Sequence, residues 1–143
     1  MTTSIFFIKK KNGSLCLVQD YWSLNTMIIK NKYPLPLISK LVLQLHKAKY
    51  LTKLNICWGF NNMCIKPRDE WKTAFYTNCK LFEPLVIFFD ITNSPATFQT
   101  MINDIFQDLI AEGIVVVYLD NILIFTKTWK NIQEPSEGYL RSW

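Results

Sequence analysis

Two polar residues, Asp120 and Asn121, interrupt an otherwise apolar stretch, GIVVVYLDNILIF, at residues 113–125. The pattern predicts a hairpin of two apolar strands whose two-residue turn is Asp120-Asn121. A turn alone explains both residues, because Asp and Asn tolerate the positive φ angles of tight turns. Chemistry at such a tip would instead need carboxylate groups, and only Asp120 carries one. The pattern alone leaves both interpretations open.

The composition is that of a folded domain with few means for zinc or histidine chemistry. Half of the 143 residues are hydrophobic and 15% are aromatic, enough for one domain with a core. His46 is the only histidine, and Cys16, Cys57, Cys64 and Cys79 form no C-x-x-C pair. We therefore expect neither a zinc site nor histidine-dependent nucleophilic catalysis.

The net charge of +5 allows an acidic partner such as nucleic acid but does not establish one. The apolar runs, about seven residues at most, are far shorter than the roughly 20 residues that span a bilayer, so no membrane partner is expected. The order IFFI before KKK is the reverse of a secretion signal, and the cysteine pattern is typical of reducing compartments. An intracellular protein, cytoplasmic or nuclear, is expected.

The rest of the sequence predicts alternating strands and helices. Asn12-Gly13 predicts a first hairpin within IFFIKKKNGSLCLVQD. YPLPLISKLVLQLHKAKY predicts a short amphipathic helix, and YLTKLNICWGF and KTAFYTNCKLFEPLVIFF predict strands. NSPATFQTMINDIFQDLIAEG predicts one long helix, which Asn93 or Ser94 caps and Gly113 ends. This order indicates an α+β domain with a mainly antiparallel sheet.

Several motifs, in a fixed order, give the chain a family resemblance. They are KKKNGSL with DYWSLN, KNKYPLP, DEWKTAF, NSPATFQTMINDIF and YLDNILIFTKT. From about Ser4 to Lys130, the chain resembles the reverse transcriptase of Ty3/gypsy-type LTR retrotransposons, and it is most similar to fungal elements. Each motif alone is weak, but their order across most of the chain is specific.

The resemblance implies an α+β fold of reverse-transcriptase fingers and palm, with an antiparallel palm sheet packed on helices and no thumb. Residues 1–128 would form this domain, with fingers at about 1–28 and 63–92 and palm at about 29–62 and 93–128. Residues 129–143 would be a divergent tail. A truncated domain of this kind is expected to leave a palm edge exposed, through which copies self-associate.

The resemblance also implies two-metal nucleotidyl transfer, with Mg²⁺ as the cofactor and an RNA or DNA template-primer and dNTPs as partners. The three catalytic and metal-binding aspartates of the family fall at Asn55, Asp120 and Asn121, so only Asp120 keeps its carboxylate. An amide offers Mg²⁺ one neutral oxygen in place of an anionic group. Weakened metal binding and almost no synthesis are therefore expected.

Nucleotide-binding positions follow from the same resemblance: Lys11, Cys16, Phe60, Asp90 and Gln99. Lys11 would meet phosphates as a point charge. Cys16 stands where the family has Arg, and Asp90 adds an anion where the family has Gly. Phe60 would bar the 2′-hydroxyl of a ribonucleotide. Gln99 stands on a helix that faces the template and the pocket.

Phe98, next to Gln99, fits that pocket or plain core packing equally well. Trp22 stands where the family has Arg, so four kinds of departure (Arg to Cys, Arg to Trp, Asp to Asn, Gly to Asp) each need one C-to-T or G-to-A change. This pattern indicates a decayed element copy. Four interpretations stay open: an inactive reverse transcriptase domain by descent, a working polymerase that tolerates the amides, a co-opted nucleic-acid-binding module, and a pseudogene product.

Overall fold

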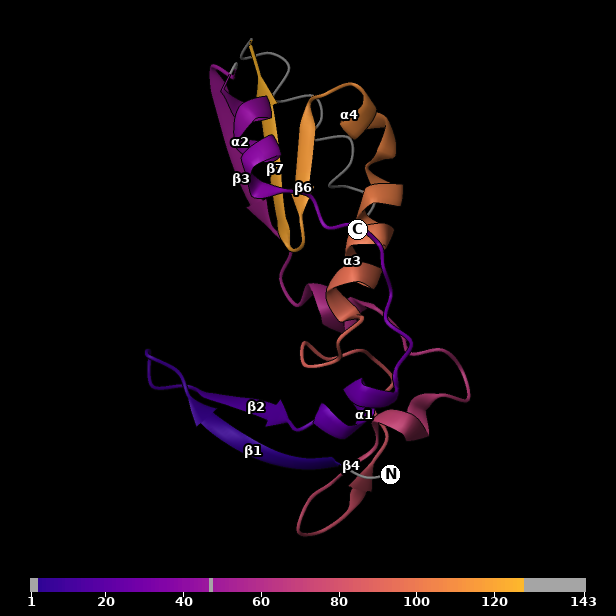
Figure 1. Cartoon of the computed structure of the whole chain (residues 1–143). Helices are drawn as coiled ribbons and strands as arrows, with labels where there is room; N and C mark the ends of the chain where they lie inside the picture. Colours follow the sequence, from indigo (N-terminus) through magenta and orange to yellow (C-terminus); the bar gives the residue numbers. More distant parts are fainter. Residues whose placement is uncertain (1–2, 47, 128–143) are drawn as a thin grey trace. The chain divides into compact units, whose positions relative to one another are not determined.

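The structure, a computed structural model, describes residues 3–46 and 48–127, which form two compact units (Figure 1). Unit 1 combines Met1–Lys32 with Trp58–Pro95, and unit 2 combines Tyr33–Cys57 with Ala96–Trp143. The predicted tail at 129–143 lies outside the described residues. Within the described ranges, no helix is long and apolar enough to cross a membrane.

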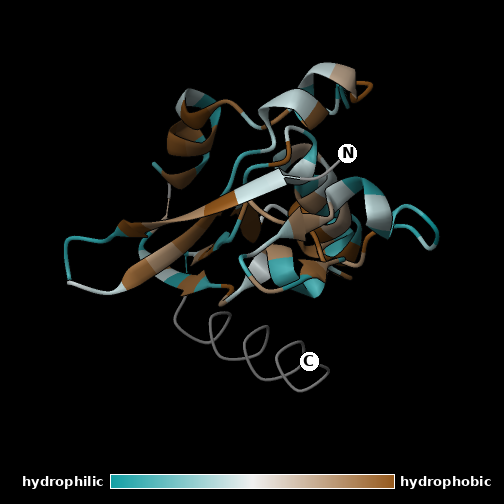
Figure 2. Cartoon of the chain, turned by 90° about the horizontal axis from the view of Figure 1, so that it is seen from below, coloured by the Kyte–Doolittle hydropathy of each residue, from teal (hydrophilic) through white to brown (hydrophobic). Residues whose placement is uncertain are grey.

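Unit 1 is built on a four-stranded sheet of order β2-β1-β4-β5. Its elements are β1 (Thr3–Lys9), β2 (Leu15–Gln19), α1 (Trp22–Met27), the 3-10 turns η1 (Gly59–Asn62) and η2 (Glu70–Thr73), β4 (Phe75–Tyr76) and β5 (Leu81–Phe82). β1 and β2 form the predicted first hairpin, in which Gly13 has a φ of +85° and Asn12 accepts two hydrogen bonds from Ser14. Figure 2 shows its apolar strands and its hydrophilic tip.

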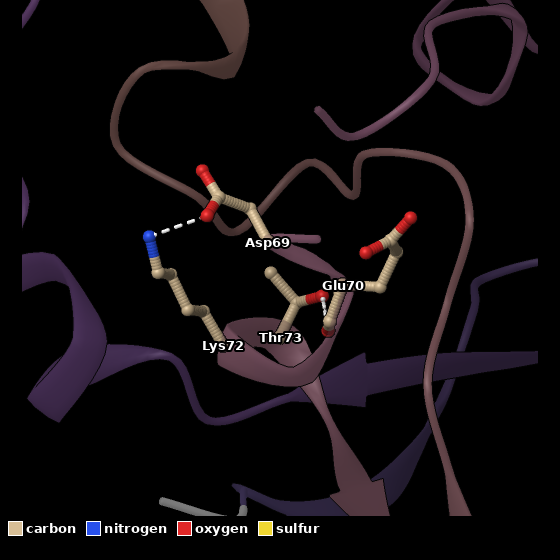
Figure 3. Close-up of polar contacts among 4 residues, drawn as sticks. All are labelled: Asp69, Glu70, Lys72 and Thr73. Atoms are coloured by element: carbon tan, nitrogen blue, oxygen red, sulfur yellow. Dashed lines mark hydrogen bonds and ion pairs between the residues drawn. The ribbon is translucent and has the colours of Figure 1, made fainter. Parts of the chain in front are cut away.

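The DEWKTAF motif forms a tight local turn at η2 (Figure 3). Lys72 Nζ lies 2.6 Å from Asp69 Oδ1, and this hydrogen bond lowers the pKa of the Asp69 carboxyl. The Thr73 hydroxyl donates to the Glu70 carbonyl at 2.8 Å. The turn presents the Thr73 carbonyl to the buried Tyr21 hydroxyl, which donates to it at 2.9 Å. Two motifs of the family resemblance are thus joined by this bond.

Unit 2 contains a three-stranded antiparallel sheet of order β3-β7-β6. Its elements are α2 (Ile38–Leu45), β3 (Tyr50–Asn55), α3 (Ser94–Ile105, with Ala96 onward in this unit), α4 (Gln107–Ala111), β6 (Val115–Tyr118) and β7 (Asn121–Thr126). Alternate residues of β7 are buried, as strand geometry requires when one face meets the core. The core combines this face with side chains of β6, α3, α4 and the residue between the two helices: Val115, Val116, Val117, Ile122, Ile124, Phe98, Ile102, Phe106 and Leu109.

The long helix predicted before Gly113 is interrupted at Phe106, so that prediction was wrong in part. Phe106 adopts φ −100° and ψ 16°, outside the helical values, and separates α3 from α4. Its backbone amide still donates to the Ile102 carbonyl at 3.0 Å, and its carbonyl still accepts from the Ile110 amide at 2.9 Å. These hydrogen bonds continue the helical spacing across Phe106, so the apolar residues before and after it keep the periodicity of one helix. The sequence pattern therefore does not reveal the interruption. Gly113 ends the segment with a φ of +71°, as predicted.

The residues expected to cap this helix make other contacts in unit 1. The Asn93 side chain accepts from the Asn31 amide at 2.9 Å and donates to the Ile29 carbonyl at 2.8 Å. The Ser94 hydroxyl donates to the Phe88 carbonyl at 2.7 Å. These contacts tie both residues at the start of α3 to backbone groups of Ile29, Asn31 and Phe88, and so fix the entry to the helix.

Gln19, at the end of β2, is a buried polar side chain. It is only 3% exposed, and within the described residues neither its amide nitrogen nor its amide oxygen has a hydrogen-bond partner. A buried polar group that lacks its hydrogen bond costs about 1–3 kcal/mol. Among the described residues, Gln19 therefore lowers the stability of unit 1.

We expect Gln19→Leu to stabilise the protein by about 1–3 kcal/mol, because it removes two unsatisfied polar atoms at nearly constant volume. Urea unfolding followed by circular dichroism measures the change. Gln107→Leu, at an exposed position of α4, is the matched control and should change stability by less than about 0.5 kcal/mol. A destabilising Gln19→Leu would show that the Gln19 amide is satisfied in solution.

Candidate active site

The three positions predicted to bind metal meet at one end of the unit 2 sheet. β3 ends at Asn55, which pairs with Asn121, the first residue of β7. The Ile56 amide donates to the Asp120 carbonyl at 2.8 Å, so Asp120 lies beside the end of β3. The prediction that Asn55, Asp120 and Asn121 converge is confirmed, although more than 60 residues separate the first from the others.

The turn of the hairpin is Leu119-Asp120, so the predicted turn, Asp120-Asn121, was wrong by one residue. Tyr118 pairs with Asn121, which leaves two residues between the strands, and Leu119 carries a φ of +52°. Leucine rarely adopts this left-handed conformation, which is strained for any residue with a Cβ. The polar pair therefore does not supply the positive φ angle. Asn121 instead belongs to the strand and pairs with Asn55.

The side chains at this end of the sheet do not fit a magnesium site. The Asn121 side-chain amide donates to Asp120 Oδ1 at 2.9 Å, so an amide hydrogen bond already engages one oxygen of this carboxylate. Within residues 3–46 and 48–127, no group of three or more His, Cys, Asp or Glu side chains is placed to hold a metal ion. Mg²⁺ prefers anionic oxygens in octahedral geometry, and here one half-buried carboxylate stands between two amides.

Gln99 lies behind the turn and is 0% exposed. Its side-chain oxygen accepts from the Leu119 amide at 2.8 Å, and its side-chain nitrogen donates to the Val117 carbonyl at 3.2 Å. These contacts engage the backbone of the hairpin, and the nucleotide contact expected from the sequence stays a prediction. Phe98 is also 0% exposed, so of its two expected roles the structure favours core packing.

In unit 1, Lys11 and Cys16 lie on the β1–β2 hairpin. Lys11 is exposed at the tip, and Cys16 is a half-buried free thiol that pairs across the hairpin with Ile8. A thiol at this position offers a phosphate no positive charge. Of the two, only Lys11 keeps the chemistry expected of a phosphate contact.

Phe60 and Asp90 belong to a second group of residues in unit 1. Phe60 is 5% exposed, and its ring lies 4.5 Å from that of Phe89 between centroids. Phe89 was not among the predicted site residues, and its place directly before Asp90 was the signal that could have identified it. Asp90 Oδ2 accepts from the backbone N–H of Gln19 at 3.4 Å. Burial raises the pKa of Tyr21, and the nearby Asp90 charge raises it further.

Asn25 of the DYWSLN motif fixes the segment around Asp90. Its side-chain nitrogen donates to the Asp90 carbonyl, and its side-chain oxygen accepts from the Thr92 amide, both at 2.8 Å. The motif therefore positions the backbone on both sides of Ile91, a buried residue. Phe60, Phe89 and Asp90 belong to unit 1, where Phe60 is buried and Phe89 and Asp90 are exposed, whereas Asn55, Asp120, Asn121 and Gln99 belong to unit 2.

Residues 8–140 match the family described as reverse transcriptase (RNA-dependent DNA polymerase). The chain belongs to the reverse transcriptase family. Among its relatives are the transposon Tf2-7 and Tf2-3 polyproteins of Schizosaccharomyces pombe (strain 972 / ATCC 24843), which are 39% and 38% identical to it over 124 residues. The match covers 87% of this chain and 9% of each relative, so the chain spans about a tenth of their length.

Solved reverse transcriptases share the fold of this domain. The foamy viral protease-reverse transcriptase in complex with an RNA/DNA hybrid superposes with a TM-score of 0.85 at 23% identity, over 97% of this chain and 18% of the other. The native prototype foamy virus protease-reverse transcriptase gives 0.81 at 26% identity, with the same coverage. The α+β reverse-transcriptase fold and the retrotransposon-type ancestry expected from the motifs are both confirmed.

Proposed function

We propose that this chain is a reverse transcriptase domain by descent that no longer performs metal-dependent DNA synthesis. The observation that carries the proposal is the pairing of Asn55 with Asn121 beside Asp120, whose carboxylate accepts a hydrogen bond from the Asn121 amide. Unit 1 would correspond to the fingers and unit 2 to the palm. Phe60 would then lie in the fingers, on the other side of the boundary expected at residue 62.

The loss of charge is large enough to stop the reaction. A unit charge about 4 Å from a divalent ion contributes roughly 8 kcal/mol before desolvation, at an effective dielectric constant of about 20. If only ~5 kcal/mol of this remains for the transition state, the rate falls by between three and four decades. Two of the three family carboxylates are missing here. The tolerated-amide interpretation would need another source for this stabilisation.

A non-catalytic nucleic-acid-binding role is the second candidate. The foamy viral relatives were solved with an RNA/DNA hybrid and with double-stranded DNA. In this chain Lys9, Lys10 and Lys11 are exposed at the tip of the β1–β2 hairpin, where they would meet phosphates of a template-primer. Cys16 and Trp22 stand where the family has arginines, and this loss argues against selection for binding. We therefore favour an inactive reverse transcriptase domain by descent over a co-opted nucleic-acid-binding module.

A primer-extension assay tests the proposal. We expect no template-directed product from the unmodified chain with Mg²⁺ or Mn²⁺, because neither ion finds its carboxylate ligands. Asp120→Ala is the matched control and should behave identically. Product that requires both dNTPs and metal, and that disappears in Asp120→Ala, would overturn the assignment of an inactive site.

A further inference from the structure

Gln99 lies at the centre of a buried hydrogen-bond chain that ends on the turn holding Asp120. Its side-chain nitrogen donates to Asn103 Oδ1 at 2.9 Å as well as to the Val117 carbonyl. The Asn103 side-chain nitrogen in turn donates to the Tyr33 hydroxyl at 2.8 Å. All of these residues belong to unit 2, so the chain connects the segment before α2, helix α3 and the hairpin within one compact body.

Gln99 engages one backbone group at the strained position of the turn, the Leu119 amide, and one two residues before it, the Val117 carbonyl. Val117 and Leu119 are 18 and 20 residues from Gln99, so neither bond follows from local helix geometry. Leu119 carries the positive φ angle, and its amide donates to the Gln99 side-chain oxygen. A strained backbone persists where its surroundings over-determine it. Among the described residues, the Gln99 side chain contacts the turn through the Leu119 amide.

The two orientations of the Gln99 amide are not equivalent. Its oxygen must face the Leu119 amide and its nitrogen must face the Val117 carbonyl, since the reverse would put donor against donor. Asn103 Oδ1 accepts from the same nitrogen, and this bond favours the orientation in which the Gln99 side chain also bonds to Val117 and Leu119. A buried polar network with each member satisfied specifies one local conformation.

We propose that Gln99 is a positioning residue that, through Leu119, holds the Leu119-Asp120 turn and so aims Asp120 and Asn121 at the end of β3. Its role in a catalytic site rests on the proposed function, whereas its hold on the turn does not. The turn conformation would then survive the loss of the carboxylates, because Gln99 engages backbone groups and not the side chains of 120 or 121.

Amide hydrogen exchange of the full chain, resolved by residue with NMR, tests the proposal without metal or nucleic acid. Gln99→Met keeps the length of the side chain and removes its amide. We expect exchange at the Leu119 amide to accelerate about tenfold or more, the size of effect that follows from one lost buried hydrogen bond. The Phe125 amide, which donates to Ile114 in the same hairpin, should change by less than about threefold. Gln107→Met, the same substitution at an exposed helix position, should leave both amides unchanged.

Equal acceleration at Leu119 and Phe125 would mean that Gln99 only stabilises the core, and an unchanged Leu119 amide would mean that it does not hold the turn. Either result overturns the proposal.

If Gln99→Met does not fold, Asn103→Ala and the unmodified protein still test the proposal. Asn103→Ala should accelerate Leu119 exchange in the same direction, and the unmodified chain should show a nuclear Overhauser contact between the Leu119 amide and the Gln99 side chain. Absence of both would refute it. Because no arm measures synthesis or metal binding, failure here is separate from failure of the proposed function.

Discussion

The double variant Asn55→Asp/Asn121→Asp is expected to bind Mn²⁺ and Mg²⁺ at least a hundredfold more tightly than the unmodified chain. Asn55 and Asn121 are cross-strand partners beside Asp120, so the substitutions create three carboxylates at one end of the sheet. They also remove the amide that donates to Asp120 Oδ1. Even ~3 kcal/mol of recovered attraction corresponds to about two decades in affinity. Isothermal calorimetry in the absence of nucleic acid measures the change.

The same double variant should be less stable than the unmodified chain without metal and should regain stability when metal is added. Three carboxylates at one site repel each other, and a bound cation relieves the repulsion and stabilises the native state by mass action. Asn62→Asp/Asn78→Asp adds the same charge at exposed positions of unit 1 and is the matched control. Metal affinity in the control equal to that of the double variant would show that net charge, and not this site, attracts the ion.

Synthesis by Asn55→Asp/Asn121→Asp should nevertheless stay poor. Cys16 offers no positive charge to a triphosphate, and the exposed Asp90 adds a negative charge. Burial is the larger cause of the raised pKa of Tyr21, and the Asp90 charge raises that pKa further. Full activity from the two restored carboxylates alone would show that these positions in unit 1 matter less than the resemblance implies.

Phe98→Ala should destabilise the protein by about 3–5 kcal/mol, the largest loss expected from a single substitution. Its side chain is 0% exposed on α3, and truncation removes buried apolar area and leaves a cavity. Such a loss is a large part of the ~5–15 kcal/mol that a domain has in total. Denaturant unfolding followed by fluorescence and circular dichroism measures the free energy of unfolding.

Phe7→Ala is the matched control for Phe98→Ala, because Phe7 is 62% exposed on β1. The same chemical change there should cost less than about 1 kcal/mol. If Phe98→Ala were as stable as Phe7→Ala, core packing would not be the main role of Phe98, and its other expected role, beside a nucleotide pocket, would be favoured.

The sequence alone determined the first hairpin and the ancestry. Asn12-Gly13 between apolar strands requires a hairpin, because these residues favour its turn geometry, and β1 and β2 pair around it. The ordered motifs predicted the reverse transcriptase family, which the match over residues 8–140 confirms. The convergence of Asn55 with Asn121 followed from that resemblance and not from periodicity, since strand patterns do not say which strands become neighbours.

Only the tertiary structure decided the details of the hairpin tip and of its support. The pairing of Tyr118 with Asn121 moved the turn to Leu119-Asp120, and a shift of one residue is invisible to a pattern that reads only apolar strands and polar breaks. The family resemblance of the NSPATFQ motif placed Gln99 near a nucleotide, and it gave no sign of the hydrogen bonds that this side chain makes with backbone groups 18 and 20 residues away. Hydrogen bonds across such separations depend on how α3 packs against β6, and local propensity carries no information about that packing.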